Sequence, residues 1–276
     1  MKRRPLDSAW TNWLRENLDR RCDPRELVEI LRKNNFALFS IKAVMGAAFP
    51  AEYEASVTAP PSPSAIATPR LTRENNPKLT KVDTNLVQLY TLDDFLSPRE
   101  CGDLVAIIDQ HLRASTLTTQ EKDTAFRTSR TCDLSMLQNP VVAAVDEKIA
   151  QTLGIRPAYA EGNQAQRYDI GQQFKAHTDY FEPNTHEYAV HGGSKGNRTW
   201  TFMVYLNEGM MGGGTKFFAI DKTFRPKLGQ AVIWNNLYPD GTPNPDTLHS
   251  GEPVIMGHKI IITQWFREQG AGPMFY

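Results

Sequence analysis

The second half of the chain contains four short segments that have the pattern of β-strands and are separated by turn residues. Each is a run of six to nine residues that combines β-branched, aromatic and aliphatic side chains. They occupy residues 164–170, 199–207, 229–234 and 258–266. No helical pattern long enough to form a crossover lies between them, so a parallel sheet is not expected. Several short strands in succession favour a β-sandwich or a jelly roll.

Helical patterns precede these strands and indicate an α+β domain. Residues 85–92 read as a strand, and residues 97–112 read as a helix with Ser97 at its N-cap. A second helix is expected over residues 139–154, where Gly154 ends it. We therefore expect a mainly β core that is flanked by helices.

The first 47 residues are expected to form a small helical segment. Leu27 and Leu31 share one helical face after Asp23, which is a favourable N-cap. Residues 48–79 lose this periodicity and are rich in Pro, Ser, Thr and Ala, as is typical of a linker. The sequence thus predicts a helical segment over 1–47, a linker over 48–79 and the main domain over 80–276.

Composition narrows the classes of partner. The chain carries 31 basic and 31 acidic side chains, so no overall field favours nucleic acid or an anionic membrane. No run of about 18 apolar residues occurs, and no apolar run follows the basic start, so we expect neither a membrane span nor a secretory signal. The three cysteines are scattered, which suits a reducing compartment, and we expect a cytoplasmic protein.

The stretch FKAHTDYF, residues 174–181, contains the first candidates for metal chemistry. If it is extended, His177 and Asp179 point to the same side, because side chains alternate along a strand. His249 offers a third ligand further along the chain. Two histidines and one carboxylate form the facial triad of non-haem Fe(II) oxygenases, which leaves metal positions open for a 2-oxo acid and O₂. The alternative is that His177 and Asp179 are simply polar residues at the end of a strand.

Lys259 fits the same chemistry. It lies at the tenth position after His249 and opens a strand that continues with three isoleucines. A lysine buried there needs an anion, and the distal carboxylate of a 2-oxo acid would supply one. An exposed lysine at the edge of a sheet is the alternative. Alternation places residues 259, 261, 263 and 265 on one face of the strand and residues 260, 262 and 266 on the other.

Four stretches, in the expected order, resemble the prolyl 4-hydroxylase type of Fe(II)/2-oxoglutarate-dependent dioxygenase. They are RYDIGQQFKAHTDYF, RTWTFMVYLNEGMMGGGTKFF, PKLGQAVIW and HSGEPVIMGHKIIITQWF. The upstream runs LYTLDDFLSPRECGDLVAII and FRTSRTCDL resemble the N-terminal part of that family. The resemblance covers about residues 82–268. It implies a double-stranded β-helix, which is a jelly-roll core, flanked by helices.

The resemblance also implies a role for each matching residue. The iron would be held by His177, Asp179 and His249. The 2-oxoglutarate would be bound by Lys259, Tyr168, Thr215 and Tyr205, the first two on its distal carboxylate. The target residue would face Phe174, Arg198 and Trp265. Two positions depart from the family's usual residues, since Phe174 stands where Tyr is common and Arg267 stands where plant and algal members tend to have His. These departures leave the substrate open.

The activity that the resemblance implies is hydroxylation of a C–H bond, with peptidyl proline as the first candidate substrate. The reaction would consume O₂ and 2-oxoglutarate and release succinate and CO₂, and the family often benefits from ascorbate. A 2-oxoglutarate oxygenase of another peptide side chain, or of a small molecule, is the alternative among enzymes. A non-catalytic iron or oxygen sensor, or a binding protein, is the alternative of another class. The sequence leaves the oligomeric state open.

Overall fold

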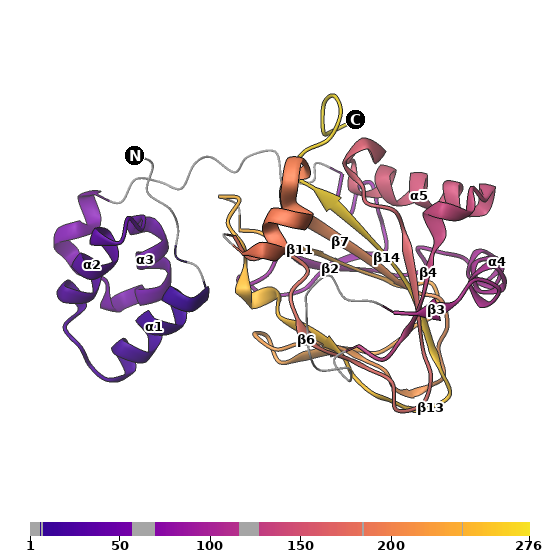
Figure 1. Ribbon diagram of the computed structural model, residues 1–276, viewed down its shortest axis with the longest axis horizontal. Coiled ribbons are helices and arrows are strands. Elements are labelled where there is room, and N and C mark those ends of the chain that lie inside the picture. The colour runs from indigo at the N-terminus through magenta and orange to yellow at the C-terminus, as the bar shows by residue number, and fades with distance from the viewer. Residues whose placement is uncertain (1–5, 7, 57–69, 116–126, 184, 239) are drawn as a thin grey trace. The chain divides into compact units, whose positions relative to one another are not determined.

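The computed structural model describes residues 6, 8–56, 70–115, 127–183, 185–238 and 240–276 (Figure 1). The chain divides into two compact units. The first comprises residues 1–64 and 239–243, and the second comprises residues 65–238 and 244–276. The buried hydrophobic residues of the first unit form one cluster, and those of the second unit form separate clusters, so each unit has its own core.

Three short helices form the first unit. They are α1 (Ser8–Asp19), α2 (Pro24–Lys33) and α3 (Leu38–Met45), followed by 3-10 turns at Gly46–Ala48 and Ala51–Ser56. At the start of α2, the side chain of Asp23 accepts a hydrogen bond from the backbone N–H of Arg25. Leu27 and Leu31 then join Leu14 in a buried cluster. The helical character predicted for the N-terminal segment is confirmed.

The predicted linker lies partly outside the described residues, because residues 57–69 are not among them. Near its start, Phe49 belongs to the core cluster of the first unit. At its end, Leu79 begins the first strand of the second unit. The boundaries between residues 47 and 48 and between residues 79 and 80 stay predictions.

Antiparallel strands build the second unit. The larger sheet has the order β1 (Leu79–Lys81), β2 (Leu89–Leu92), β11 (Ala231–Asn235), β7 (Arg198–Tyr205), β14 (Lys259–Arg267), β5 (Gln164–Tyr168), β4 (Arg130–Asp133) and β3 (Arg113–Ala114). The smaller sheet has the order β10 (Lys222–Phe224), β9 (Thr215–Phe217), β12 (His249–Gly251) and β6 (Phe174–His177). A two-stranded sheet pairs β13 (Val254–Met256) with β8 (Met211–Gly212). Every pairing among these described strands is antiparallel, as predicted.

Two helices pack on one face of the larger sheet (Figure 1). α4 (Pro98–Asp109) begins after the predicted N-cap Ser97, and α5 (Pro140–Leu153) ends at the predicted Gly154. Their apolar faces and the central strands share the main core, which includes Leu104, Ile108, Val145, Ile149, Phe202, Val204, Ile260 and Ile262. Shorter helical turns lie at Leu134–Leu137, Pro157–Tyr159, Tyr188–Gly192, Gly193–Lys195 and Pro245–Thr247.

The opposite face of the larger sheet contributes to a second core cluster, which it shares with the smaller sheet. Tyr205 and Trp234 of the larger sheet belong to this cluster together with Phe217 and Phe224 of the smaller one. Strand β14 alternates between the two sides as predicted. Its members at 260, 262 and 266 lie in the helix-covered core, and those at 259, 261, 263 and 265 line a cavity between the sheets. The fold is the expected double-stranded β-helix, and the cavity lies inside it.

Within the described residues, no helix combines the length and the apolar character needed to cross a bilayer.

Candidate metal centre

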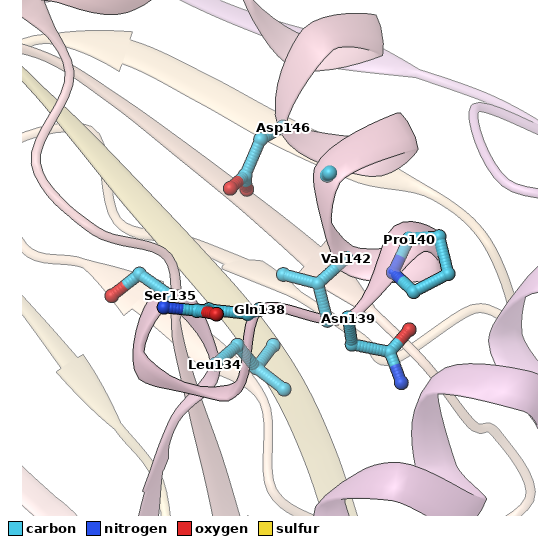
Figure 2. Close-up of a pocket in the computed structure, with 8 residues that line it drawn as sticks. Leu134, Ser135, Gln138, Asn139, Pro140, Val142 and Asp146 are labelled. Atoms are coloured by element: carbon cyan, nitrogen blue, oxygen red, sulfur yellow. The ribbon is translucent and has the colours of Figure 1, made fainter.

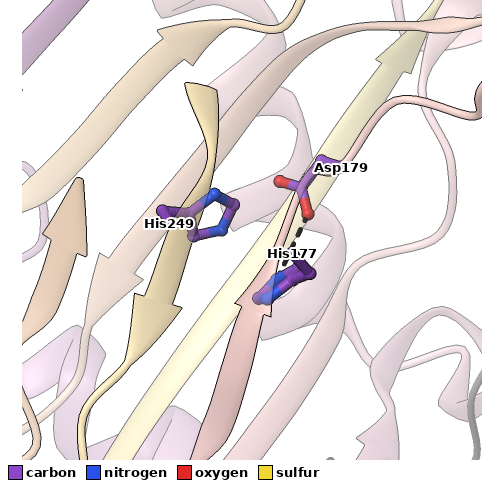
Figure 3. A group of neighbouring side chains, drawn as sticks. All are labelled: His177, Asp179 and His249. Carbon is purple, nitrogen blue, oxygen red and sulfur yellow. Dashed lines mark ion pairs between the residues drawn. The ribbon is translucent and has the colours of Figure 1, made fainter. Parts of the chain in front are cut away.

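Two neighbouring strands of the smaller sheet carry the predicted histidine ligands. β6 ends at His177 and β12 begins at His249, and these two residues are direct antiparallel partners. Asp179 follows two residues after the end of β6. One potential ligand atom from each of the three side chains lies within 4.8 Å of the other two (Figure 3). Strand pairing therefore joins residues that are far apart in the sequence into one cluster.

Backbone carbonyls fix the orientation of both imidazole rings. Nδ1 of His177 lies 2.7 Å from the carbonyl oxygen of Lys175, and Nδ1 of His249 lies 2.9 Å from that of Thr247. A carbonyl oxygen only accepts, so each Nδ1 carries the proton and each Nε2 keeps a lone pair. Metal-binding histidines typically donate their second nitrogen in this way. The donor set of two such nitrogens and one carboxylate fits Fe(II).

The electrostatics of the site favour the protonation states that a metal requires. Burial, followed by the repulsion that a protonated His249 would exert, lowers the pKa of His177 to about 3. Burial alone would raise the pKa of Asp179, but electrostatic interactions with His249, His177 and Arg198 lower it. At neutral pH the site therefore presents a neutral imidazole at His177 and a carboxylate at Asp179. Both forms bind a metal without first losing a proton.

The same cavity contains a buried lysine. Lys259 is 1% exposed, and its Nζ lies 4.4 Å from the centre of the Tyr168 ring. None of the described residues forms a hydrogen bond or ion pair with this ammonium, and burial lowers the pKa of Lys259 to about 7. Tyr168 and Thr215, both predicted for the cosubstrate, line the cavity with it. An unpaired buried ammonium is unfavourable, so this end of the cavity suits an anion.

Tyr205 lies behind this pocket. It is fully buried, and its hydroxyl is 2.7 Å from Oγ1 of Thr215 and 3.1 Å from the carbonyl oxygen of Phe224. It is not among the residues that line the cavity. Tyr205 therefore supports Thr215 through a hydrogen bond.

Phe174 and Trp265, which were predicted to face the target, line the cavity, and Arg198 lies beside it. The Phe174 ring stacks on His177 with centroids 3.6 Å apart. Nε1 of Trp265 is buried and has no hydrogen-bond partner among the described residues. Two hydrogen bonds of 2.7 and 2.8 Å tie Arg198 to Glu161, and its guanidinium lies 4.0 Å from the centre of the Trp265 ring. Arg198 therefore acts on the cavity wall through the indole.

A half-buried carboxylate that the sequence did not reveal holds two arginines. Glu161 accepts hydrogen bonds from Arg198 and, at 2.8 Å, from Arg267. Arg267 also donates to the carbonyl oxygens of Gly192 and Gly196. Burial alone would raise the pKa of Glu161, but the two guanidinium groups lower it. Glu161 lies outside any strand or helix, where no periodic pattern marks a residue as buried.

Further residues complete the cavity wall. The guanidinium of Arg127 lies 4.9 Å from the centre of the Phe174 ring. Trp234 of β11 meets the His249 ring edge-on at 4.9 Å. The remaining lining residues are Gln166, Met203, Gly251, Ile261 and Thr263.

A second hollow opens at the start of α5 and shares no residue with this cavity (Figure 2). It is lined by Leu134, Ser135, Gln138, Asn139, Pro140, Val142, Ala143 and Asp146. Asp146 is the one ionisable group among these described residues, and its carboxylate accepts a hydrogen bond of 3.1 Å from Asn163. This lining offers neither a metal site nor an acid–base pair.

Comparisons with known proteins agree with this geometry. The sequence model of the 2OG-Fe(II) oxygenase superfamily matches residues 163–267, which include the three candidate ligands and Lys259. Prolyl 4-hydroxylase subunit alpha-3 of Mus musculus is 32% identical over 190 residues, which are 67% of this chain and 34% of the relative. The chain thus spans about a third of the length of that relative. Probable prolyl 4-hydroxylase 3 of Arabidopsis thaliana is 30% identical over 199 residues, which are 64% of this chain and 68% of the relative.

A solved structure supports the same assignment. The viral collagen prolyl hydroxylase of Paramecium Bursaria Chlorella virus-1, in its 2OG complex, matches with a TM-score of 0.53 and 26% identity. The match covers 65% of this chain and 95% of the viral one. The chain belongs to the prolyl 4-hydroxylase type of the 2OG-Fe(II) oxygenase superfamily, and its His/Asp/His cluster and buried lysine fit the Fe(II) and 2-oxoglutarate of that family.

Proposed function

We propose that the protein is a dioxygenase that uses Fe(II), O₂ and 2-oxoglutarate to hydroxylate a C–H bond of a peptidyl proline. The observation that carries the proposal is a single cavity with a His/Asp/His cluster and an unpaired buried lysine. A metal cluster alone fits many functions, and a buried lysine alone fits many anions. Together they fit a cosubstrate that chelates a metal at one end and carries a carboxylate at the other.

Each part of the cavity then has a task. When bound, Fe(II) and 2-oxoglutarate supply the oxidising chemistry, with succinate and CO₂ as the coproducts. His177, Asp179 and His249 hold the metal in a fixed geometry. Lys259 pairs with the distal carboxylate beside Tyr168, so it orients the cosubstrate. The surrounding sheets shield these groups from bulk water.

The cavity wall and the relatives favour proline as the target. The mouse and Arabidopsis relatives are named prolyl 4-hydroxylases, and the viral structure is named a collagen prolyl hydroxylase. Phe174 and Trp265 provide flat apolar surfaces that suit a pyrrolidine ring. The unpaired Nε1–H of Trp265 is a donor for a peptide carbonyl. A peptide or protein is therefore the proposed partner.

Succinate release and peptide mass test this proposal together. The protein is supplied with Fe(II), 2-oxoglutarate and O₂, and with either a proline-rich peptide or the same peptide with every proline replaced by alanine. The proline peptide should stimulate succinate release and gain oxygen atoms, and His177→Ala and Lys259→Ala should abolish both effects. Equal stimulation of succinate release by the alanine peptide would indicate that another side chain is the target. No succinate from metal-loaded protein would favour the sensor or binding protein.

Two finer expectations belong to the same proposal. Ascorbate should sustain turnover, which is tested by omitting it and following succinate release over many cycles. A cytoplasmic location is supported by the three cysteines, Cys22, Cys101 and Cys132, which are free. Cell fractionation in the source organism tests the location.

A further inference from the structure

A line of buried hydrogen bonds ends on the carboxylate ligand. Nε1 of Trp234 lies 2.9 Å from Oδ1 of Asn236, whose Nδ2 lies 2.8 Å from Oγ1 of Thr201. Oγ1 of Thr201 in turn lies 2.7 Å from Oδ2 of Asp179. Trp234, Asn236 and Thr201 are at most 1% exposed. Three polar side chains from the larger sheet and the loop after it are thus committed to one carboxylate of the metal cluster.

The chemistry of the first residue sets the direction of every bond in this line. An indole N–H can only donate, so Trp234 requires the carbonyl oxygen of the Asn236 amide. The amide NH₂ of Asn236 then faces Thr201 and donates to its hydroxyl oxygen. Because that oxygen accepts from Asn236, the hydroxyl proton of Thr201 is directed to Asp179. Oδ2 of Asp179 accepts this hydrogen bond and is therefore unprotonated.

We infer that Thr201 and Asn236 are positioning residues, which commit Oδ2 of Asp179 to the protein and leave Oδ1 for the metal. Oδ1 is the oxygen that faces the other ligands, since it lies 3.7 Å from Nε2 of His177. A carboxylate held in this way offers one oxygen, so it fills one metal position and leaves its neighbours for the cosubstrate and O₂. The inference rests on the proposed metal centre and adds to it the residues that set its geometry.

Trp234 connects this line to a second ligand. Its ring contacts the His249 ring edge-on, with centroids 4.9 Å apart, while its N–H starts the hydrogen bonds that reach Asp179. Outer partners of metal ligands commonly control metal affinity, and their removal typically costs about 10–100-fold. The same order of effect is expected here for the hydroxyl that touches Asp179.

The matched pair Thr201→Val and Thr201→Ser tests the inference with Co(II) as the probe. Valine keeps the shape of threonine but removes the hydroxyl, whereas serine keeps the hydroxyl and removes a methyl group. Calorimetric titration should show about 10–100-fold weaker Co(II) binding for Thr201→Val and nearly unchanged binding for Thr201→Ser. Thermal unfolding of the metal-free variants reports stability separately. Wild-type affinity in Thr201→Val, or equal loss in both variants, would overturn the inference.

Two further variants keep the outcome decisive. If Thr201→Val does not fold, Asn236→Leu replaces it, because leucine is close in volume and cannot direct the Thr201 hydroxyl. Its Co(II) binding should be weaker than that of the wild type, and unchanged binding would overturn the inference. His177→Ala distinguishes a failure of the metal centre from a failure of the positioning role. Wild-type protein that binds no Co(II) would refute the metal centre, whereas binding that is lost in His177→Ala but kept in the Thr201 and Asn236 variants would refute the positioning role alone.

Discussion

Burial of Lys259 leads to a quantitative prediction for the pH dependence of 2-oxoglutarate binding. Without an anion, burial lowers its pKa from 10.5 to about 7. A bound carboxylate favours the charged form, so binding above pH 7 must take up one proton. The charged fraction then falls from about 0.9 at pH 6 to about 0.1 at pH 8, so the Kd should rise about tenfold, equivalent to about 1.4 kcal/mol.

Calorimetry on Co(II)-loaded protein measures this effect directly. Titrations of 2-oxoglutarate at pH 6, 7 and 8, in buffers with different ionisation enthalpies, give both the Kd and the number of protons taken up. Lys259→Arg is the control, because a guanidinium stays charged throughout this range and its Kd should be independent of pH. A Kd that is constant from pH 6 to pH 8 in the wild type, without proton uptake, would refute the reasoning.

Three further predictions concern stability. In protein without 2-oxoglutarate, Lys259→Met should raise the thermal midpoint at pH 6, because it removes the buried ammonium. The gain should shrink from pH 7 to 10.5, because the unfolded wild type holds more protons than the folded form in this range and the stability of the wild type therefore rises with pH. An unchanged thermal midpoint at pH 6 would contradict this reasoning. Glu161→Gln should lower the free energy of unfolding in urea by about 3–5 kcal/mol, because the buried Arg267 and the largely covered Arg198 lose their counter-charge. The exposed Glu74→Gln should change it by at most about 0.5 kcal/mol, and equal effects of the two substitutions would argue against the ionic network. Gly229→Ala should strongly destabilise the fold, because φ is 70° and a Cβ would lie 2.0 Å from a backbone oxygen. Gly102→Ala in α4 should stabilise the fold by up to about 1 kcal/mol. Similar unfolding midpoints for the two variants would contradict the backbone argument.

Local patterns predicted the parts of the site that lie on strands. The alternation along β14 is enough to place Lys259 and Trp265 on one side, which is the cavity side, because a strand allows only two directions for its side chains. Alternation in an extended stretch also predicted a shared side for His177 and Asp179, although β6 ends at His177 and Asp179 follows it. Residue types suggested His249 as the third ligand, but its meeting with His177 depends on the register of β6 and β12, which no local pattern specifies.

The residues that support the site were not visible in the sequence. Glu161 is paired with Arg198 of β7 and with Arg267 at the end of β14, so its role exists only after the sheet has formed. In the sequence, Thr201 and Asn236 are ordinary polar residues. Their role depends on which of their atoms donate and which accept hydrogen bonds between β7 and the loop after β11. Tyr205, which the resemblance assigned to the cosubstrate pocket, reaches that pocket through its hydrogen bond to Thr215, and its role in binding the cosubstrate stays a prediction.

The proposed activity requires that Fe(II) and 2-oxoglutarate share one site. Anaerobic addition of both to the purified protein should produce the weak visible charge-transfer band of an Fe(II)–2-oxo acid chelate. That band should be absent in His177→Ala and should require a much higher 2-oxoglutarate concentration in Lys259→Ala. If wild-type protein shows no band under these conditions, or if His177→Ala keeps it, the central claim is contradicted.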